Sequence, residues 1–136
     1  MIGRGYRQPG WDGFILCVQG RAIGYLQCFN LALDTGRTFP LERRATRGID
    51  LFIGEPGELG QGHGPAFVRL AAECLLAQPD VKRVIGDPEP ANRRSRRAFE
   101  KAGFRDSGER TVPGGSARLM VREEPARIAK RRQTGV

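Results

Sequence analysis

Short apolar runs, separated by glycine, proline and charge, predict six strands and two helices along this chain. The runs at 14–18 and 22–29 are joined by Gln19-Gly20-Arg21, which is typical of a β-hairpin. Residues 33–47 mix glycine, proline and charge without periodicity and predict a surface loop placed to border a site. Residues 49–53 predict the third strand, which leads into a glycine-rich loop.

Two helical patterns follow that loop. Pro65 suits a first helical position and Pro79 ends the first helix. A strand is predicted at 81–86, and a second helix follows, with Asn92 able to cap its start and Gly103 its end. The first helix is expected to bury a wide stripe against a sheet, formed by Phe67, Val68, Ala71, Ala72, Cys74, Leu75 and Leu76.

A second hairpin is predicted over 104–111 and 116–121, around the turn Pro113-Gly114-Gly115. Its last strand alternates Ala117, Leu119 and Val121 with Arg118, Met120 and Arg122, which predicts one buried face. The element order indicates an α/β fold on one sheet. We expect one domain over 1–125 with its core at 14–121, followed by a basic, disordered tail at 126–136.

Composition narrows the class of protein. The 136 residues fit a single domain, and neither a membrane-spanning apolar run nor a secretory signal is recognisable, so we expect a cytoplasmic protein. The three cysteines lie far apart and His63 is the only histidine, which argues against structural zinc, a disulfide framework and a histidine-based triad. The cysteines are interpreted as apolar filling, and no metal is expected.

The net charge points to an anionic partner. Lysine and arginine number 23 against 15 acidic residues, giving +8 at pH 7, and most of the cations are arginine, which binds phosphate as a planar fork. Charge alone leaves nucleic acid and a phosphate-rich cofactor both open. The glycine loop at 54–64 favours the cofactor, because backbone N–H groups at a helix start form a cradle for a diphosphate.

Two segments together carry a family resemblance. Leu59-Gly-Gln-Gly-His-Gly64 before a helix, and the segment from Asn92 to Phe104 after a strand, resemble the acetyl-CoA signatures of the GNAT superfamily of N-acyltransferases. Further runs resemble the aminoglycoside 6'-N-acetyltransferases: Arg47-Gly-Ile-Asp50, Pro79-Asp-Val81, Asp87-Pro-Glu-Pro-Ala-Asn92 and Glu100-Lys-Ala-Gly-Phe104. Siderophore-pathway acyltransferases share parts of this pattern. The resemblance covers roughly 14–121 and implies a mixed, mainly antiparallel sheet flanked by helices.

The resemblance also implies a reaction, the direct attack of a primary amine on acetyl-CoA without a metal. Asp50 matches the general base, and Asp50 and Asp87 match acidic residues at the acceptor site. The residues implied to bind the cofactor are Phe52, Ile53 and Gly54 for the pantetheine arm, Leu59, Gly60, Gln61, Gly62, His63 and Gly64 for the pyrophosphate, Asn92 for the arm, and Arg93 and Arg97, with Arg94, for the remaining phosphate.

Other interpretations of these residues stay open. Asp50 could be a carboxylate neutralised by an arginine such as Arg47, and Asp87 before a proline is typical of a turn or cap. Pro65 removes one donor from the cradle, and Phe99 stands where many members have a tyrosine thought to protonate the leaving thiolate. The loop at 38–46 is basic where the aminoglycoside enzymes are acidic, which weakens attraction for a cation.

The start of the chain departs from the family as well. The GNAT fold opens with a strand and helices, whereas residues 1–13 are short and glycine-rich, so we expect that unit to be lacking and the sheet to have an exposed edge. A shortened gene product or a homodimer would account for this. Competing functions are acetylation of another small amine, of siderophore-pathway type, and a non-catalytic coenzyme A-binding or nucleic-acid-associated basic protein.

Overall fold

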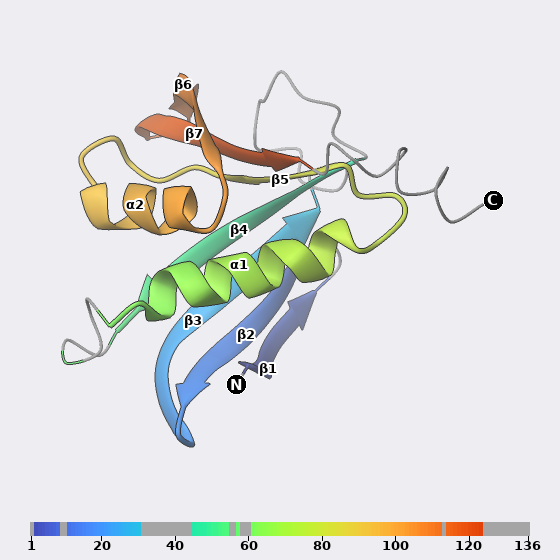
Figure 1. Ribbon diagram of the computed structural model, residues 1–136, viewed down its shortest axis with the longest axis vertical. Helices are drawn as coiled ribbons and strands as arrows, with labels where there is room; N and C mark the ends of the chain where they lie inside the picture. The colour runs from blue at the N-terminus through green and yellow to red at the C-terminus, as the bar shows by residue number, and fades with distance from the viewer. Residues whose placement is uncertain are drawn as a thin grey trace.

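The computed structural model describes residues 2–8, 11–30, 45–54, 57, 61–112 and 114–123, which form one sheet and two helices (Figure 1). The sheet order is β1-β2-β3-β4-β5-β7-β6, and every neighbouring pair is antiparallel except β4 and β5. In chain order the elements are β1 (Ile2–Gln8), β2 (Trp11–Val18), β3 (Arg21–Asn30), β4 (Thr46–Ile53), α1 (His63–Leu76), β5 (Arg83–Gly86), α2 (Arg93–Lys101), β6 (Arg105–Val112) and β7 (Gly115–Glu123).

The six strands and two helices expected from the sequence are confirmed, and β1 is an additional strand. It pairs with β2 from Ile2 opposite Leu16 to Gln8 opposite Trp11, so β2 is not the exposed edge that the sequence suggested. The segment IGRGYRQ has no alternation of apolar and polar residues. It forms a strand because its backbone pairs with that of β2, and a hydropathy pattern does not detect such pairing. The predicted tail at 126–136 lies outside the described residues.

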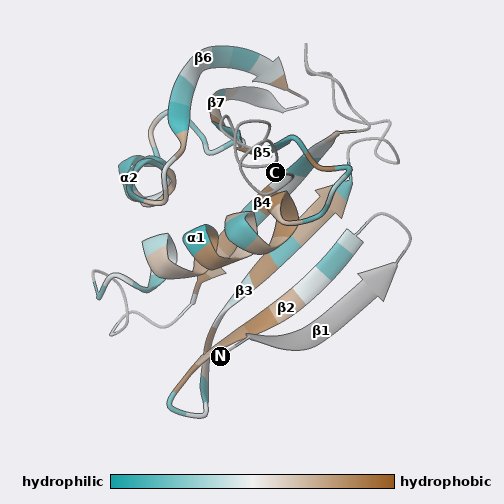
Figure 2. Ribbon diagram, turned by 45° about the vertical axis from the view of Figure 1, so that its right-hand side comes forward, coloured by the Kyte–Doolittle hydropathy of each residue, from teal (hydrophilic) through white to brown (hydrophobic). Residues whose placement is uncertain are grey.

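Both helices pack on the same face of the sheet. The main core joins Leu26, Ile49 and Val84 of the strands to Val68 and Ala72 of α1, and it continues to Phe99 and Ala102 at the end of α2. Figure 2 shows the apolar side of α1 turned toward β3 and β4. A smaller cluster of Phe29, Ile85, Leu119 and Val121 covers part of the other face, where Trp11 stacks on Phe29. No described helix has the length and apolarity needed to cross a membrane.

Two burial predictions were wrong. Met120 is fully buried rather than exposed, because β7 lies between β5 and β6 and has apolar residues packed on both of its faces. Cys74 is exposed, since the buried stripe of α1 is centred on Val68, Ala72 and Leu76 and Cys74 lies beside it. Cys17 and Cys28 are half-buried.

The strands β4 and β5 diverge in the middle of the sheet. Their parallel pairing runs only from Thr46 opposite Arg83 to Gly48 opposite Ile85. Beyond Gly48, β4 stays paired with β3 as far as Ile53, so its other edge is open (Figure 1). The divergence brings the N-terminal ends of α1 and α2 to the same end of the molecule, beside the open edge of β4.

Candidate functional site

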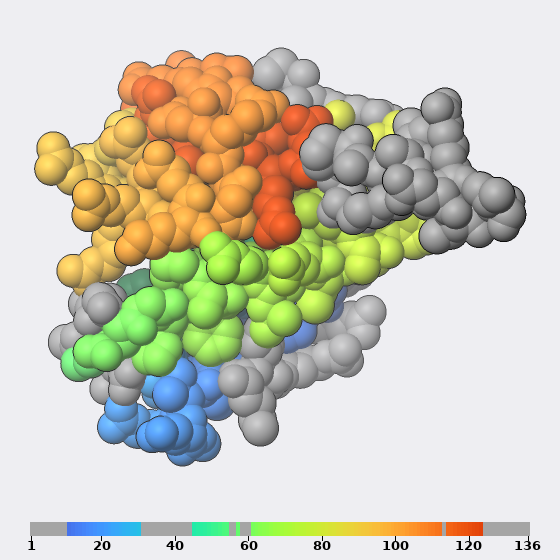
Figure 3. Space-filling model, viewed as in Figure 1, coloured from blue at the N-terminus to red at the C-terminus, as the bar shows by residue number. Residues whose placement is uncertain are grey.

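A groove of about 540 Å³ lies where the end of β4, the start of α1 and one side of α2 meet. In Figure 3 the first residues of α1 (green) lie next to α2 (yellow to orange) at the left of the molecule. The groove is lined by Leu51, Phe52, Ile53, Gly62, His63, Gly64, Pro65, Asn92, Arg93, Arg94, Ser95, Arg97, Ala98 and Lys101. Nine of these are cofactor-binding residues expected from the sequence: Phe52, Ile53, Gly62, His63, Gly64, Asn92, Arg93, Arg94 and Arg97.

The open edge of β4 offers backbone hydrogen-bonding groups to the groove. The Gly54 N–H donates to the Ile23 carbonyl at 2.8 Å, which fixes the direction of alternate peptide groups along β4. The N–H and C=O of Leu51 and Ile53 therefore point away from β3, toward the side where pairing with β5 has ended. An extended ligand with amide groups can pair with this edge as an added strand would.

The start of α1 forms the second wall. Its N-cap, Gly62, has a φ of +82°, a left-handed conformation that favours glycine. The first turn holds no acidic residue, and the amides of His63 and Gly64 lie at the positive end of the helix dipole. Pro65 is the third helical residue and has no N–H, so the first turn presents two backbone donors to an anion instead of three.

The third wall is α2, whose start is capped as the sequence predicted. The Asn92 side-chain oxygen accepts a hydrogen bond from the Ser95 N–H at 3.1 Å, which leaves the Asn92 amide nitrogen as a donor for a ligand. Arg93, Arg94 and Arg97 are exposed, and their side chains make no ion pair or hydrogen bond with the described residues. Three uncompensated guanidinium groups thus border one groove, which favours a phosphate-bearing ligand.

Asp50 lies on the sheet face opposite the helices, half-buried and paired in register with Gln27. It is separated from Phe52, which is 67% exposed and lines the groove, by a single residue. Arg47 lies on the other face of β4, because its position differs from that of Asp50 by an odd number. Arg47 forms an ion pair with Asp80 at 3.2 Å and donates to the Asn30 side chain at 3.3 Å.

Two carboxylates, one on β2 and one on β4, lie near the thiol of Cys28. Burial, with smaller contributions from the carboxylates of Asp12 and Asp50, raises the pKa of the Cys28 thiol to about 12. Asp12 lies directly opposite Cys28 on β2 and was not recognised in the sequence, because a lone carboxylate at the start of a hairpin carries no motif. Asp12 shares the helix-facing side of the sheet with Cys28, whereas Asp50 lies on the other face.

Asp87 directly follows Gly86, the last residue of β5, and is half-buried. Asp50 and Asp87 therefore belong to the two diverging arms of the sheet, one on β4 and one just beyond β5. The segment after Asp87 is fixed to β7, since the Arg118 N–H donates to the Pro88 carbonyl at 2.9 Å. Asn92, not Asp87, caps α2, which excludes the helix-cap interpretation of Asp87.

The remaining predicted residues lie beside the groove or cannot be placed. Leu59 and Gly60 are outside the described residues, and Gly54 and Gln61 are exposed without lining the groove. Lys101 was missed, although its helical spacing from Arg94 and Arg97 puts all three on one side of α2. Within the described ranges, histidine, cysteine, aspartate and glutamate form no cluster of three that could hold a metal ion.

The chain is similar in sequence to known proteins. The family model described as an acetyltransferase (GNAT) domain matches residues 3–112. The chain is 37% identical over 115 residues to aminoglycoside N(6')-acetyltransferase type 1 of Klebsiella pneumoniae, which covers 83% of this chain and 57% of the relative. It is 39% identical over 97 residues to a kanamycin resistance protein of Rhizobium radiobacter, covering 71% of this chain and 90% of that protein.

The solved structures show the same fold. Aminoglycoside acetyltransferase AAC(6')-Ib in complex with coenzyme A matches with a TM-score of 0.80 and 33% identity, over 90% of this chain and 71% of that one. Its complex with ribostamycin and coenzyme A matches with a TM-score of 0.79 and 34% identity, over 86% of this chain and 66% of that one. The chain spans little more than half the length of the Klebsiella relative. On the family match and these identities, the chain belongs to the GNAT acetyltransferase family.

Proposed function

We propose that this chain transfers an acetyl group from acetyl-CoA to a primary amine, and that the acceptor is the 6'-amine of an aminoglycoside. The observation that carries the proposal is the groove, in which the open edge of β4, the start of α1 and the arginines of α2 lie next to the strand that bears Asp50. The match to the AAC(6')-Ib complex with coenzyme A and kanamycin supports both the proposed donor, acetyl-CoA, and the proposed acceptor, an aminoglycoside.

The groove has separate places for the parts of the cofactor. The backbone of Leu51 and Ile53 pairs with the amides of the pantetheine arm, and the Asn92 amide nitrogen donates to the same arm. The amides of His63 and Gly64 bind the diphosphate at the helix start. Arg93 and Arg97 neutralise the remaining phosphate charge. This arrangement directs the thioester along β4 toward the divergence from β5.

The chemical step needs a base, an oxyanion donor and correct placement. Asp50 accepts the proton of the ammonium group, directly or through one water, so that the amine can attack the thioester carbonyl carbon. A C–N bond forms, the C–S bond breaks and coenzyme A leaves as its thiolate. Backbone N–H groups near Ile53 stabilise the oxyanion. Phe99 carries no ionisable group, so water protonates the thiolate.

The proposal that the acceptor is an aminoglycoside is supported by the acidic residues near the groove. Asp50 and Asp87 stand on the two arms of the divergence, so a polyamine is attracted there although the whole chain carries +8. Because the donor is acetyl-CoA, we propose that the enzyme acts in the cytoplasm. We also propose that the chain forms a homodimer, and light scattering of the purified chain tests that part.

The proposal is tested by following the release of free thiol from acetyl-CoA in the presence of kanamycin, tobramycin, ribostamycin or simple amines. We expect turnover with the aminoglycosides and a loss of about a hundredfold or more in Asp50→Asn. Asp80→Asn is the matched control, because Asp80 pairs with Arg47 on the other side of the sheet. Turnover with simple amines alone would replace the acceptor, and coenzyme A binding without any turnover would contradict the enzyme assignment.

A further inference from the structure

The segment that joins β5 to α2, residues 87–91, is held by its carbonyl groups. Pro88 and Pro90 have fixed φ angles and no N–H, so each offers only its carbonyl to a backbone hydrogen bond. The Pro88 carbonyl accepts from the Arg118 N–H at 2.9 Å. The Pro90 carbonyl accepts from the guanidinium of Arg96 at 2.9 Å. Two arginines, one on β7 and one on α2, therefore fix the segment.

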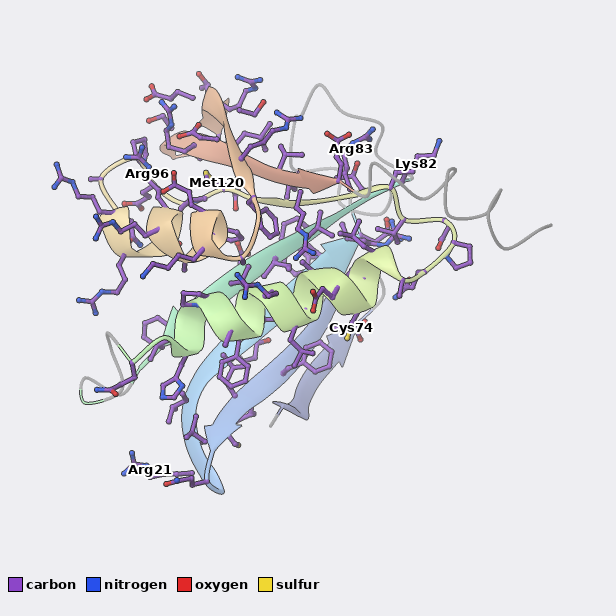
Figure 4. All side chains as sticks on the ribbon, viewed as in Figure 1. Arg21, Cys74, Lys82, Arg83, Arg96 and Met120 are labelled. Carbon is purple, nitrogen blue, oxygen red and sulfur yellow. The ribbon has the colours of Figure 1, made fainter. Side chains whose placement is uncertain are left out.

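One carboxylate, that of Asp106 on β6, joins these two arginines. It accepts hydrogen bonds from the Arg118 guanidinium at 2.9 and 3.1 Å, and it lies 3.6 Å from the guanidinium of Arg96. The Gly108 N–H donates to the same carboxylate at 2.9 Å, which fixes its orientation. Figure 4 shows Arg96 on the side of α2 turned away from α1. Asp106, Arg96 and Arg118 thus form one ion-paired group, called here the Asp106 cluster.

The segment places Asp87 on the sheet face turned away from the helices. The hydrogen bond from β7 to the Pro88 carbonyl continues the register of β5 with β7, so Asp87 lies opposite Leu119. Leu119 belongs to the smaller apolar cluster on that face, and directly opposite residues share a face. Asp50 lies on the same face. The two carboxylates are therefore presented to one side of the sheet by strands that diverge.

We infer that Asp106 is a positioning residue for the acceptor amine: through its two arginines it fixes the segment and holds the Asp87 carboxylate in place relative to Asp50. The inference rests on the proposed function, which gives both carboxylates to the acceptor site. A reacting group displaced by about 1 Å can lose about a hundredfold in rate. Asp106 lies opposite Met120 on the helix side of the sheet, so it acts through the segment and not by touching the acceptor.

The cofactor is held by other residues. The described lining of the cofactor groove includes no member of the Asp106 cluster. The start of α2 also has its own cap, since the Asn92 side chain accepts from the Ser95 N–H at 3.1 Å. Loss of the cluster should therefore impair use of the acceptor and leave the Kd of coenzyme A within about twofold of the wild type.

Two variants release the segment in different ways. Asp106→Asn places an amide donor beside two guanidinium groups, and it should raise the KM for kanamycin about tenfold and lower kcat about fivefold. Arg96→Lys keeps the charge of α2 but loses the planar fork that reaches both the Pro90 carbonyl and Asp106, so it should show the same changes. Both are measured by free-thiol release, with the Kd of coenzyme A from calorimetry.

Glu123→Gln is the matched control. Glu123 is also shared by two arginines, Arg83 at 3.8 Å and Arg105 at 2.9 Å, but it lies opposite the first residue of β5, away from the segment. We expect its KM, kcat and Kd to equal those of the wild type.

A double-mutant cycle separates positioning from a role in folding. Because Asp106 acts through Asp87, Asp106→Asn should cause no further loss of kcat/KM in Asp87→Asn. Losses that multiply in the double variant would overturn the inference, as would wild-type kinetics in Asp106→Asn and Arg96→Lys, and acetyl transfer itself would stand. A parallel rise in the Kd of coenzyme A would also overturn it, since the cluster would then only hold α2. Absence of turnover in the wild type would contradict the proposed function, and with it the acceptor role of the cluster.

Discussion

The ring of Phe99 lies against the backbone of Gly86, in the space that a side chain at residue 86 would occupy. A Cβ atom built on Gly86 would stand 2.2 Å from Cζ and 2.3 Å from Cε1 of the ring. Phe99 is 3% exposed and contacts Phe104 edge-on with ring centroids 5.0 Å apart. This contact holds α2, and with it Asn92, Arg93 and Arg97, over the point where β5 ends.

Gly86→Ala should therefore disturb both stability and cofactor binding. The added methyl group forces the buried ring to move, which costs about 2 kcal/mol in the free energy of unfolding, and the displaced α2 should raise the Kd for coenzyme A. Urea denaturation and calorimetry measure the two effects. Gly57→Ala is the matched control, because a Cβ at residue 57 meets no atom of the described residues within 4 Å. Equal stability of the two variants would contradict the steric explanation.

Pro65→Ala should strengthen binding of the cofactor. Pro65 is the third residue of α1, where a backbone N–H has no partner inside the helix, so alanine restores a donor at the positive end of the helix dipole. We expect the Kd for coenzyme A to fall by about fivefold. Ala66→Gly, one residue further on, changes the same turn without adding a donor, since the Ala66 N–H already bonds to the Gly62 carbonyl. An unchanged Kd in Pro65→Ala would show that the diphosphate does not reach this turn.

Helices and strands were predicted well from the sequence where the hydropathy pattern and the helix-capping residues indicate the same boundaries. Asn92 and Gly103 bound α2 as expected, because an Asn side chain satisfies a helix start and a glycine with a φ of +95° ends one. The groove was also predictable, because a glycine loop before a helix indicates an anion-binding site, and so does an arginine-rich helix with a capped start. Nine of the expected cofactor residues meet there for that reason.

Relationships between distant segments were not predictable from one sequence. The burial of Met120 depends on β7 lying between β5 and β6, and the pairing of β1 with β2 depends on backbone bonds that leave no hydropathy signal. In the sequence, the arginines of α2 form one basic face of the helix. Only the packing of α2 divides that face into a stripe beside α1 and a stripe beside Asp106.

Cys28 should resist alkylation in the folded protein, whereas Cys74 should react. Burial and the carboxylates of Asp12 and Asp50 raise the Cys28 pKa to about 12, so almost no thiolate exists at pH 8, and Cys74 is exposed on α1. Mass spectrometry after iodoacetamide treatment should find Cys74 modified first. In Cys74→Ser, Asp12→Asn should make Cys28 react at a lower pH, because a negative neighbour is lost. The same pH dependence with and without Asp12 would contradict this account.

Acid should weaken the fold in part through Asp106. Hydrogen bonds from Arg118 and from the Gly108 N–H lower the pKa of Asp106 below its ordinary value of 3.8. A carboxyl group whose pKa is lowered by folding stabilises the protein above its unfolded pKa, and that contribution disappears as the pH falls through the folded pKa. Asp106→Asn should therefore unfold at lower urea than the wild type at pH 7, and the difference should shrink as the pH is lowered below 3.8. Glu109→Gln removes a charge from the same strand as the matched control. An equal pH dependence in the two variants would show that the Arg118 pair does not set the acid stability of α2 and β6.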